Sequence, residues 1–231
     1  MSDDKLPARS SQREITAFLH KAANLPAHSR TDGRLIFALD ATASREQLWD
    51  RASQIQARMF EEAGKVGRLQ IQLCYYRGNQ EFRAQPWTGD TRALAHRMGD
   101  LRCRAGLTQI GRVLSHALAE HARQKIQALV FVGDAVEESP QGLYDLAGKL
   151  AILGVPLFLF QEGRDREVET VFRKMARLTR GAYASFDESS HDQLRRLLCA
   201  VAVYASGGVN ALKEYSLTQG QEVKALLQQL S

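Results

Sequence analysis

The sequence predicts an α/β protein with a doubly wound, mostly parallel, Rossmann-like sheet, flanking helices and one antiparallel edge strand. Two continuous apolar runs, Leu35–Leu39 and Ala128–Val132, are typical of strands covered on both faces, as parallel strands usually are. From residue 109 onward, helical and strand-like segments alternate, which is the pattern of a sheet wound by crossover helices. Two alternating segments around Gly78-Asn79 predict a hairpin and therefore the antiparallel strand.

The elements of the first half of the chain are predicted from periodicity and turn residues. Apolar side chains at helical spacing, such as Ile15, Phe18 and Leu19, indicate a leading helix, and the same spacing recurs in a crossover helix after the first strand. Alternating apolar and polar residues predict the two hairpin strands, joined by a two-residue turn. In order, these elements are helix 12–23, strand 35–39, helix 47–62, and strands 68–77 and 80–87.

The second half of the chain repeats one unit, a helix followed by a short apolar strand. Its predicted elements are helix 109–122, strand 127–133, helix 142–153, strand 156–161, helix 165–179, strand 182–186 and helix 191–206. The pair Gly207-Gly208 ends the last helix, and a further helical stretch at 223–230 follows. We therefore expect three parts: an N-terminal helical extension at 1–29, the main domain at 30–207, and a C-terminal tail with a short helix at 208–231.

Composition narrows the class of protein. The chain has 231 residues, of which 44% are hydrophobic and 25% charged, as in ordinary globular proteins. No apolar stretch approaches the ~20 residues needed to span a bilayer, and residues 1–11 are polar, so we expect a cytoplasmic protein without a membrane partner. Three cysteines without a C-x-x-C pair indicate buried thiols. The net charge of +5 comes from arginines on solvent faces of helices, and few aromatics accompany them, so nucleic acid is not the expected partner.

Oxygen-bearing side chains stand at the ends of both apolar runs. Asp40 ends the first run, and Thr42 and Ser44 follow at alternate positions, so their hydroxyls project the same way. Asp134 ends the second run, and two neighbouring parallel strands would bring both carboxylates to one edge of the sheet. Thr108 precedes the predicted helix 109–122, and its hydroxyl would either cap that helix or face a metal. Hard divalent cations prefer such oxygens, so the sequence predicts a site for Mg²⁺, with Mn²⁺ or Ca²⁺ as alternatives.

The order and spacing of these five residues resemble the von Willebrand factor A (vWA) family, over roughly residues 30–207. The metal-ion-dependent adhesion site (MIDAS) of that family reads Asp-x-Ser-x-Ser, then a distant Thr and a distant Asp. The resemblance, which is to intracellular bacterial-type single-domain members, implies a vWA fold and implies that the metal ligands, direct or through water, are Asp40, Thr42, Ser44, Thr108 and Asp134.

Two positions depart from the family pattern. Thr42 stands where Ser is usual and keeps the hydroxyl, whereas Ala135 follows Asp134 where Gly is common. The resemblance implies a non-catalytic protein–protein interaction module. Two carboxylates only just neutralise a divalent cation, so an open coordination position would attract an acidic side chain of the partner protein.

Two other functions remain open from the residues. An Asp after the first strand and a later Gly-Asp also resemble haloacid-dehalogenase-like, Mg²⁺-dependent phosphatases, in which the Asp attacks phosphorus. However, Thr42 replaces the usual second Asp, and Lys125 lies close to Asp134 for the lysine that the superfamily needs. The other alternative is a vWA scaffold that has lost its metal and assembles through its helices or edge hairpin. Glu137 and Glu138 are predicted to be an exposed loop pair.

Overall fold

The computed structural model of the chain describes residues 33–43, 69–187 and 198–205. Several predictions lie outside these ranges: helices 12–23, 47–62 and 223–230, the extension at 1–29, the tail at 208–231 and the candidate ligand Ser44.

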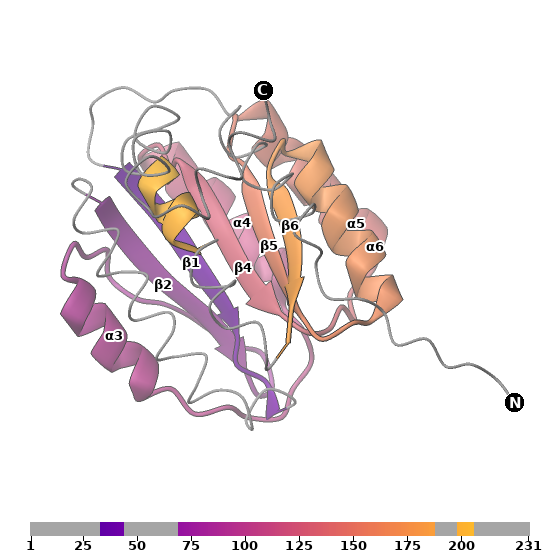
Figure 1. Cartoon of the computed structure of the whole chain (residues 1–231), viewed down its shortest axis with the longest axis horizontal. Coiled ribbons are helices and arrows are strands. Elements are labelled where there is room, and N and C mark those ends of the chain that lie inside the picture. Colours follow the sequence, from indigo (N-terminus) through magenta and orange to yellow (C-terminus); the bar gives the residue numbers. More distant parts are fainter. Residues whose placement is uncertain (1–32, 44–68, 188–197, 206–231) are drawn as a thin grey trace, which may run out of the picture.

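The described strands form one sheet of the predicted kind, in the order β3-β2-β1-β4-β5-β6 (Figure 1). Their bounds are β1 Gly33–Asp40, β2 Leu69–Arg77, β3 Glu81–Ala84, β4 Ala128–Gly133, β5 Leu157–Glu162 and β6 Ala182–Phe186. Every neighbouring pair is parallel except β2 and β3, which are antiparallel. The predicted doubly wound sheet with one antiparallel edge strand is therefore confirmed.

Helices cover both faces of this sheet. The labelled helices are α3 Thr91–Gly99, α4 Ile110–Arg123, α5 Pro140–Ile152 and α6 Arg166–Leu178. Residues 198–205 are also helical, and they pack with α3 on one face, whereas α4, α5 and α6 pack on the other. Figure 1 shows helix 198–205 in front of the sheet and α4 behind it.

The central strand β1 is buried on both faces, as its continuous apolar run predicted. Leu35, Phe37 and Leu39 join the core on the α3 side, and Ile36 and Ala38 join the core on the α4 side. Because side chains alternate along a strand, a run of five apolar residues fills two cores at once. This burial fixes the position of Asp40, which ends the strand.

Two local details differ from the sequence prediction. Helix α3 was not predicted, although the Asp90 carboxylate caps it by accepting the N–H groups of Arg92 and Ala93, each at 3.0 Å. The hairpin turn has three residues, 78–80, because the register pairs Arg77 with Glu81. The two-residue turn was therefore wrong by one residue.

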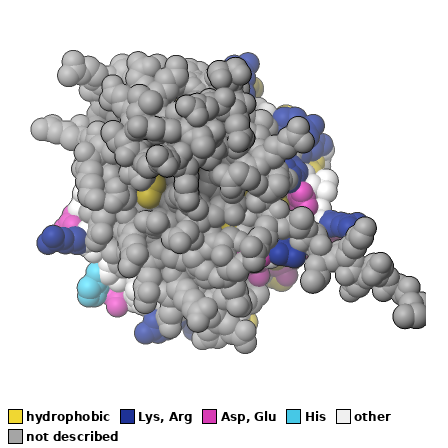
Figure 2. Space-filling model, viewed as in Figure 1, with side chains coloured by type: hydrophobic (Ala, Val, Ile, Leu, Met, Phe, Trp, Pro, Cys, Tyr) yellow, Lys and Arg dark blue, Asp and Glu magenta, His cyan; other side chains and the backbone are white. Residues whose placement is uncertain are grey.

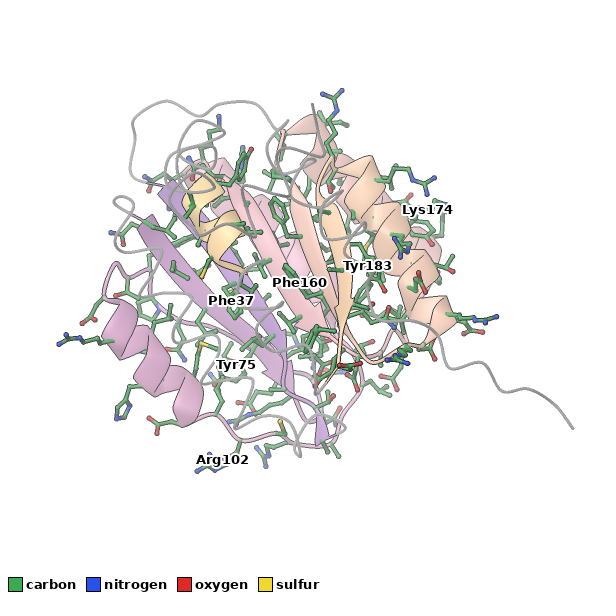
Figure 3. The ribbon with its side chains drawn as sticks, viewed as in Figure 1. Phe37, Tyr75, Arg102, Phe160, Lys174 and Tyr183 are labelled. Atoms are coloured by element: carbon green, nitrogen blue, oxygen red, sulfur yellow. The ribbon has the colours of Figure 1, made fainter. Side chains whose placement is uncertain are left out.

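Other sequence expectations hold in the described residues. Cys74 and Cys199 are buried thiols, and Cys103 is half-buried. The inward stripe of α6 is buried as predicted, and on its outer side Arg173 and Lys174 lie over the rings of Tyr183 and Tyr144, at 4.3 and 3.8 Å (Figure 3). Among the described residues, no helix combines the length and hydropathy needed to cross a bilayer.

Candidate metal centre at the carboxyl edge of the sheet

The parallel pairing of β1 with β4 brings two predicted ligands to the same edge. Leu39 pairs with Val132, so Asp40 lies beside Gly133, the residue that precedes Asp134. A Cβ at Gly133 would lie only 3.3 Å from the Cβ of Asp40. This is the edge toward which the arrowheads of β1, β2 and β4 point in Figure 1. Ligands of open α/β sheets bind at this edge, beyond the carboxyl ends of the strands.

Asp40 is fully buried, and two hydrogen bonds orient its carboxylate. Its Oδ1 accepts the backbone N–H of Thr42 at 2.8 Å, and its Oδ2 accepts the Tyr76 hydroxyl, also at 2.8 Å. Tyr76 is the register partner of Asp40 on β2, so the strand pairing itself delivers this hydroxyl. Together these bonds hold the carboxylate in one orientation at the end of β1.

Thr108 is tied to the loop after β4 and does not cap α4. Its N–H donates to Glu137 Oε2 at 2.7 Å, and its Oγ1 accepts the N–H of Glu137 at 2.9 Å. The N-cap position belongs to Gln109, which makes no side-chain capping bond. The capping role considered for Thr108 is therefore wrong. Its hydroxyl keeps one lone pair and its hydrogen for a further partner.

Glu138 caps α4 in place of Thr108. Its Oε2 accepts the N–H of Ile110 and its Oε1 accepts the N–H of Gly111, each at 2.7 Å. A carboxylate at this position satisfies two amides that have no partner within the helix, and it lies at the positive end of the helix dipole. Glu137 and Glu138 thus bind backbone amides, a role that the prediction of an exposed loop pair missed.

A third segment, Leu101–Gln109, packs against the same edge. The N–H of Arg104 donates to the carbonyl oxygen of Ala41 at 3.0 Å, and the N–H of Gly78 donates to the carbonyl of Arg104 at 3.1 Å. Gly106 passes so close that a Cβ there would lie 2.0 Å from the carbonyl oxygen of Gly78. The loops that follow β1 and β4 and the loop that carries Thr108 are therefore held together.

One buried oxygen at this edge has no partner. The Oδ1 of Asp134 is shielded from solvent and accepts no hydrogen bond from the residues that the structure describes. Burying a carboxylate oxygen without a partner costs free energy, and a cation would offset that cost. The described residues contain no cluster of three His, Cys, Asp or Glu side chains suited to a metal. A cation here would depend on two carboxylates and neighbouring hydroxyls, the donor set that the sequence predicts and that Mg²⁺ accepts.

The opposite edge of the sheet holds a polar cluster of a different kind. Glu120, on α4, accepts hydrogen bonds from Trp87 Nε1 at 2.7 Å and Arg123 Nη1 at 2.6 Å, and it pairs with Arg34 at 3.4 Å. Burial alone would raise the pKa of Glu120, but the hydrogen bonds from Trp87 and Arg123 outweigh it, and the pKa lies below its usual value. Since this carboxylate is paired within the protein, the cluster stabilises the fold.

Comparison with known proteins shows which folds the chain resembles. No protein-family model matches the sequence, and no curated protein matches it. Among solved structures, a von Willebrand factor type A protein from Catenulispora acidiphila is similar at 17% identity with a TM-score of 0.59, over 77% of this chain and 47% of that chain. The VWA domain of SpRpn10 is similar at 15% identity with a TM-score of 0.57, over 75% of this chain and 95% of that one.

A third similar structure is an aerotolerance-related membrane protein from Bacteroides fragilis NCTC 9343, with multiple mutations to serines. It has 16% identity and a TM-score of 0.53, over 72% of this chain and 98% of that one. At these identities the likeness concerns the fold alone. The chain has a vWA-like fold, in agreement with the family that its motif resembles.

Proposed function

We propose that this protein is a non-catalytic interaction module that binds an acidic side chain of a partner protein through a divalent cation at the carboxyl edge of its sheet. The observation that supports this function best is the Oδ1 of Asp134, which is shielded from solvent and accepts no hydrogen bond from the described residues. Asp134 directly follows Gly133, the residue that lies beside Asp40. The vWA-like fold agrees with it, because the family that the motif resembles uses this edge for such contacts.

Different residues would bind Mg²⁺ and orient its ligands. Asp40 and Asp134 supply the two negative charges, and Thr42 and Thr108 supply neutral hydroxyls, with Ser44 expected from the sequence motif. Tyr76 keeps Asp40 in one orientation, and Glu137 keeps Thr108 beside the loop of Asp134. A bound Mg²⁺ would supply an electrophilic position for a carboxylate of the partner.

Two observations favour binding over the phosphatase alternative. Asp40 is 0% exposed, which leaves little room beside it for a phosphate ester, a group much larger than a single cation. Lys125 precedes β4, at the amino edge of the sheet, whereas Asp134 follows β4. A six-residue strand spans roughly 20 Å, so this lysine does not reach the acids at the other edge.

Thermal unfolding in EDTA and in millimolar Mg²⁺, Mn²⁺ or Ca²⁺ tests the cation site. The informative variant is Asp134→Asn, with Asp145→Asn, on the exposed side of α5, as the matched control. In wild type and control, a cation at a hundredfold excess over its Kd adds about 2.7 kcal/mol, which raises Tm by several degrees. In Asp134→Asn the rise disappears, because the site loses one of its two carboxylates.

Other outcomes favour the alternatives. A Tm that no cation changes in wild type would contradict the proposal and favour the metal-free scaffold. Hydrolysis of p-nitrophenyl phosphate by the wild type in Mg²⁺, lost in Asp40→Asn, would favour the phosphatase instead.

A further inference from the structure

Five arginines gather beside the candidate centre and form what we call the arginine rim: Arg77, Arg83, Arg102, Arg104 and Arg112. They come from β2, β3, the loop 101–109 and the first turn of α4. Among the described residues, the ion pairs of the rim all involve Glu81, which lies 3.1 Å from Arg77 and 3.5 Å from both Arg83 and Arg104. The five arginines and Glu81 together carry a formal charge of +4.

The rim is held in place by the backbone around it. Arg77 Nη1 donates to the carbonyl of Arg102 at 2.8 Å, and Arg112 Nη1 donates to the carbonyl of Gln80 at 2.6 Å. The side chains of Arg83 and Arg104 are 65% and 66% exposed, and their contacts with Glu81 are long, so most of their donors face solvent. A partner would therefore meet charges that are already positioned, which reduces the entropy cost of binding.

The rim is continuous with the candidate centre. The N–H of Arg104 binds the carbonyl of Ala41, the residue after Asp40, and Leu107, which is 68% exposed, directly precedes Thr108. Figure 3 places Arg102 at the edge toward which β1 and β2 run, and Figure 2 shows Lys and Arg side chains at that lower edge. A partner that contacts the centre would also lie on the rim and on an exposed leucine.

We infer that the partner is an acidic protein segment, with several carboxylates besides the one at the cation and an apolar residue that packs on Leu107. This inference rests on the proposed function, because it names the partner of the same edge. Guanidinium groups bind carboxylates through paired, charge-assisted hydrogen bonds, and complementary charge speeds the encounter of the two proteins. The exposed leucine calls for an apolar contact that a purely charged ligand does not supply.

Nucleic acid fits this surface less well. Proteins that bind single strands stack bases on aromatic rings, but the two rings nearest the rim lie under its own arginines. Arg77 is 5.4 Å from the ring centre of Tyr75, and Arg112 is 5.5 Å from that of Phe82.

Fluorescence anisotropy with three labelled probes tests the inference. The probes are a twelve-residue peptide in which aspartate and glutamate alternate with leucine, its asparagine and glutamine counterpart, and a twelve-nucleotide single-stranded DNA. The proteins are wild type, the double variant Arg83→Ala/Arg104→Ala, and the control Arg166→Ala/Arg177→Ala on exposed positions of α6. Each titration is repeated in EDTA and in Mg²⁺.

The acidic peptide is expected to bind wild type and control alike, and the rim variant about tenfold more weakly, as two exposed charge pairs predict. The neutral peptide and the DNA bind at least about tenfold more weakly than the acidic peptide. Failure of wild type to bind the acidic peptide, equal weakening by the control, or equal affinity for DNA would each overturn the inference. If the rim variant binds the acidic peptide more weakly even in EDTA, and Mg²⁺ changes no affinity, the role of the rim stands and only the cation site is rejected.

Discussion

The hydroxyl of Tyr76 has a role that a variant can isolate, because it donates to one oxygen of the buried Asp40 carboxylate. In Tyr76→Phe this hydrogen bond is lost, so we expect the free energy of unfolding in EDTA to fall by about 1–3 kcal/mol. The Mg²⁺-dependent rise in stability should also shrink, since Asp40 is no longer held in one orientation. Urea unfolding in EDTA and in Mg²⁺ measures both effects.

Tyr183→Phe is the matched control for this prediction. Its hydroxyl donates to a neutral group, Oε1 of Gln161, at 2.7 Å. Tyr183 lies on β6, at the end of the strand order opposite β3. We expect a smaller loss, about 0.5–1.5 kcal/mol, and an unchanged response to Mg²⁺. Equal losses in the two variants would contradict a special role for Tyr76.

At the scale of single residues, the sequence predicted the residues that end the strands. It did not predict the residues that hydrogen-bond to them. Asp40, Thr42 and Asp134 follow apolar runs, so their common edge could be predicted from local pattern. Tyr76 meets Asp40 only through the register of β1 with β2, which no local pattern encodes. Glu137 and Glu138 resemble a polar loop in the sequence, and their bonds to the α4 segment depend on how that loop folds back.

At the scale of elements, the close passage of the loop 101–109 over the hairpin turn can be tested with two glycines. In Gly106→Ala the new Cβ would meet the carbonyl of Gly78 at 2.0 Å, so the loop must move and Thr108 with it. We expect lower stability and a weaker response to Mg²⁺, both measured by thermal unfolding.

Gly148→Ala is the control, because the same added methyl finds nothing within 4 Å on the helix α5. There, alanine is expected to stabilise the protein by about 0.5–1 kcal/mol and to leave the Mg²⁺ response unchanged. Effects of the same sign in the two variants would mean that the loop does not pack as described.

Elements with a strong periodicity were predicted well, and those that depend on tertiary context were not. The runs of β1 and β4 and the inward stripes of α4 and α6 follow from burial, which leaves a clear pattern. Among the side chains of α3 whose burial is described, Leu94 and Met98 are buried, so its apolar pattern is weak, although Asp90 is a recognisable cap. The hairpin turn gained a residue because Gln80 adopts a positive φ of 60°, which is uncommon for a residue other than glycine.

At the scale of the whole molecule, the amino edge should govern how stability depends on pH. Burial lowers the pKa of His116, whose Nε2 lies 2.8 Å from Gln72 Oε1, and the charge of Glu120 only partly opposes this. Burial and Lys125 also lower the pKa of His121. The unfolded chain therefore binds more protons than the folded one as the pH falls through about 6.5, and stability decreases there.

Urea unfolding between about pH 7.5 and 5.5 measures this decrease. In His116→Gln the imidazole is gone and part of the pH dependence should disappear with it. A wild-type stability that is constant over this range, or a variant with the same pH dependence, would contradict the prediction. Below about pH 4.5 a further loss is expected from Glu120, whose lowered pKa means that its carboxylate stabilises the folded state.

The two edges of the sheet thus differ in whether their carboxylate oxygens are paired within the protein. At the amino edge, both oxygens of Glu120 accept hydrogen bonds, whereas at the carboxyl edge Oδ1 of Asp134 accepts none from the residues that the structure describes. The class of sheet, its antiparallel edge strand and the edge of the candidate site could be predicted from the sequence, because parallel strands separated by helices allow few arrangements. The pairing of individual polar atoms could not, because it depends on distances that only the folded chain defines.

The cap that Glu138 places on α4 has a consequence for the kind of ligand that this edge admits. The first amides of a helix form a natural receptor for phosphate and other anions. Here the carboxylate of Glu138 already accepts these amides, so it occupies the position that an external anion would take. A free phosphate or nucleotide would have to displace a tethered anion, so such ligands are excluded from the helix and incoming acids are directed elsewhere on the edge.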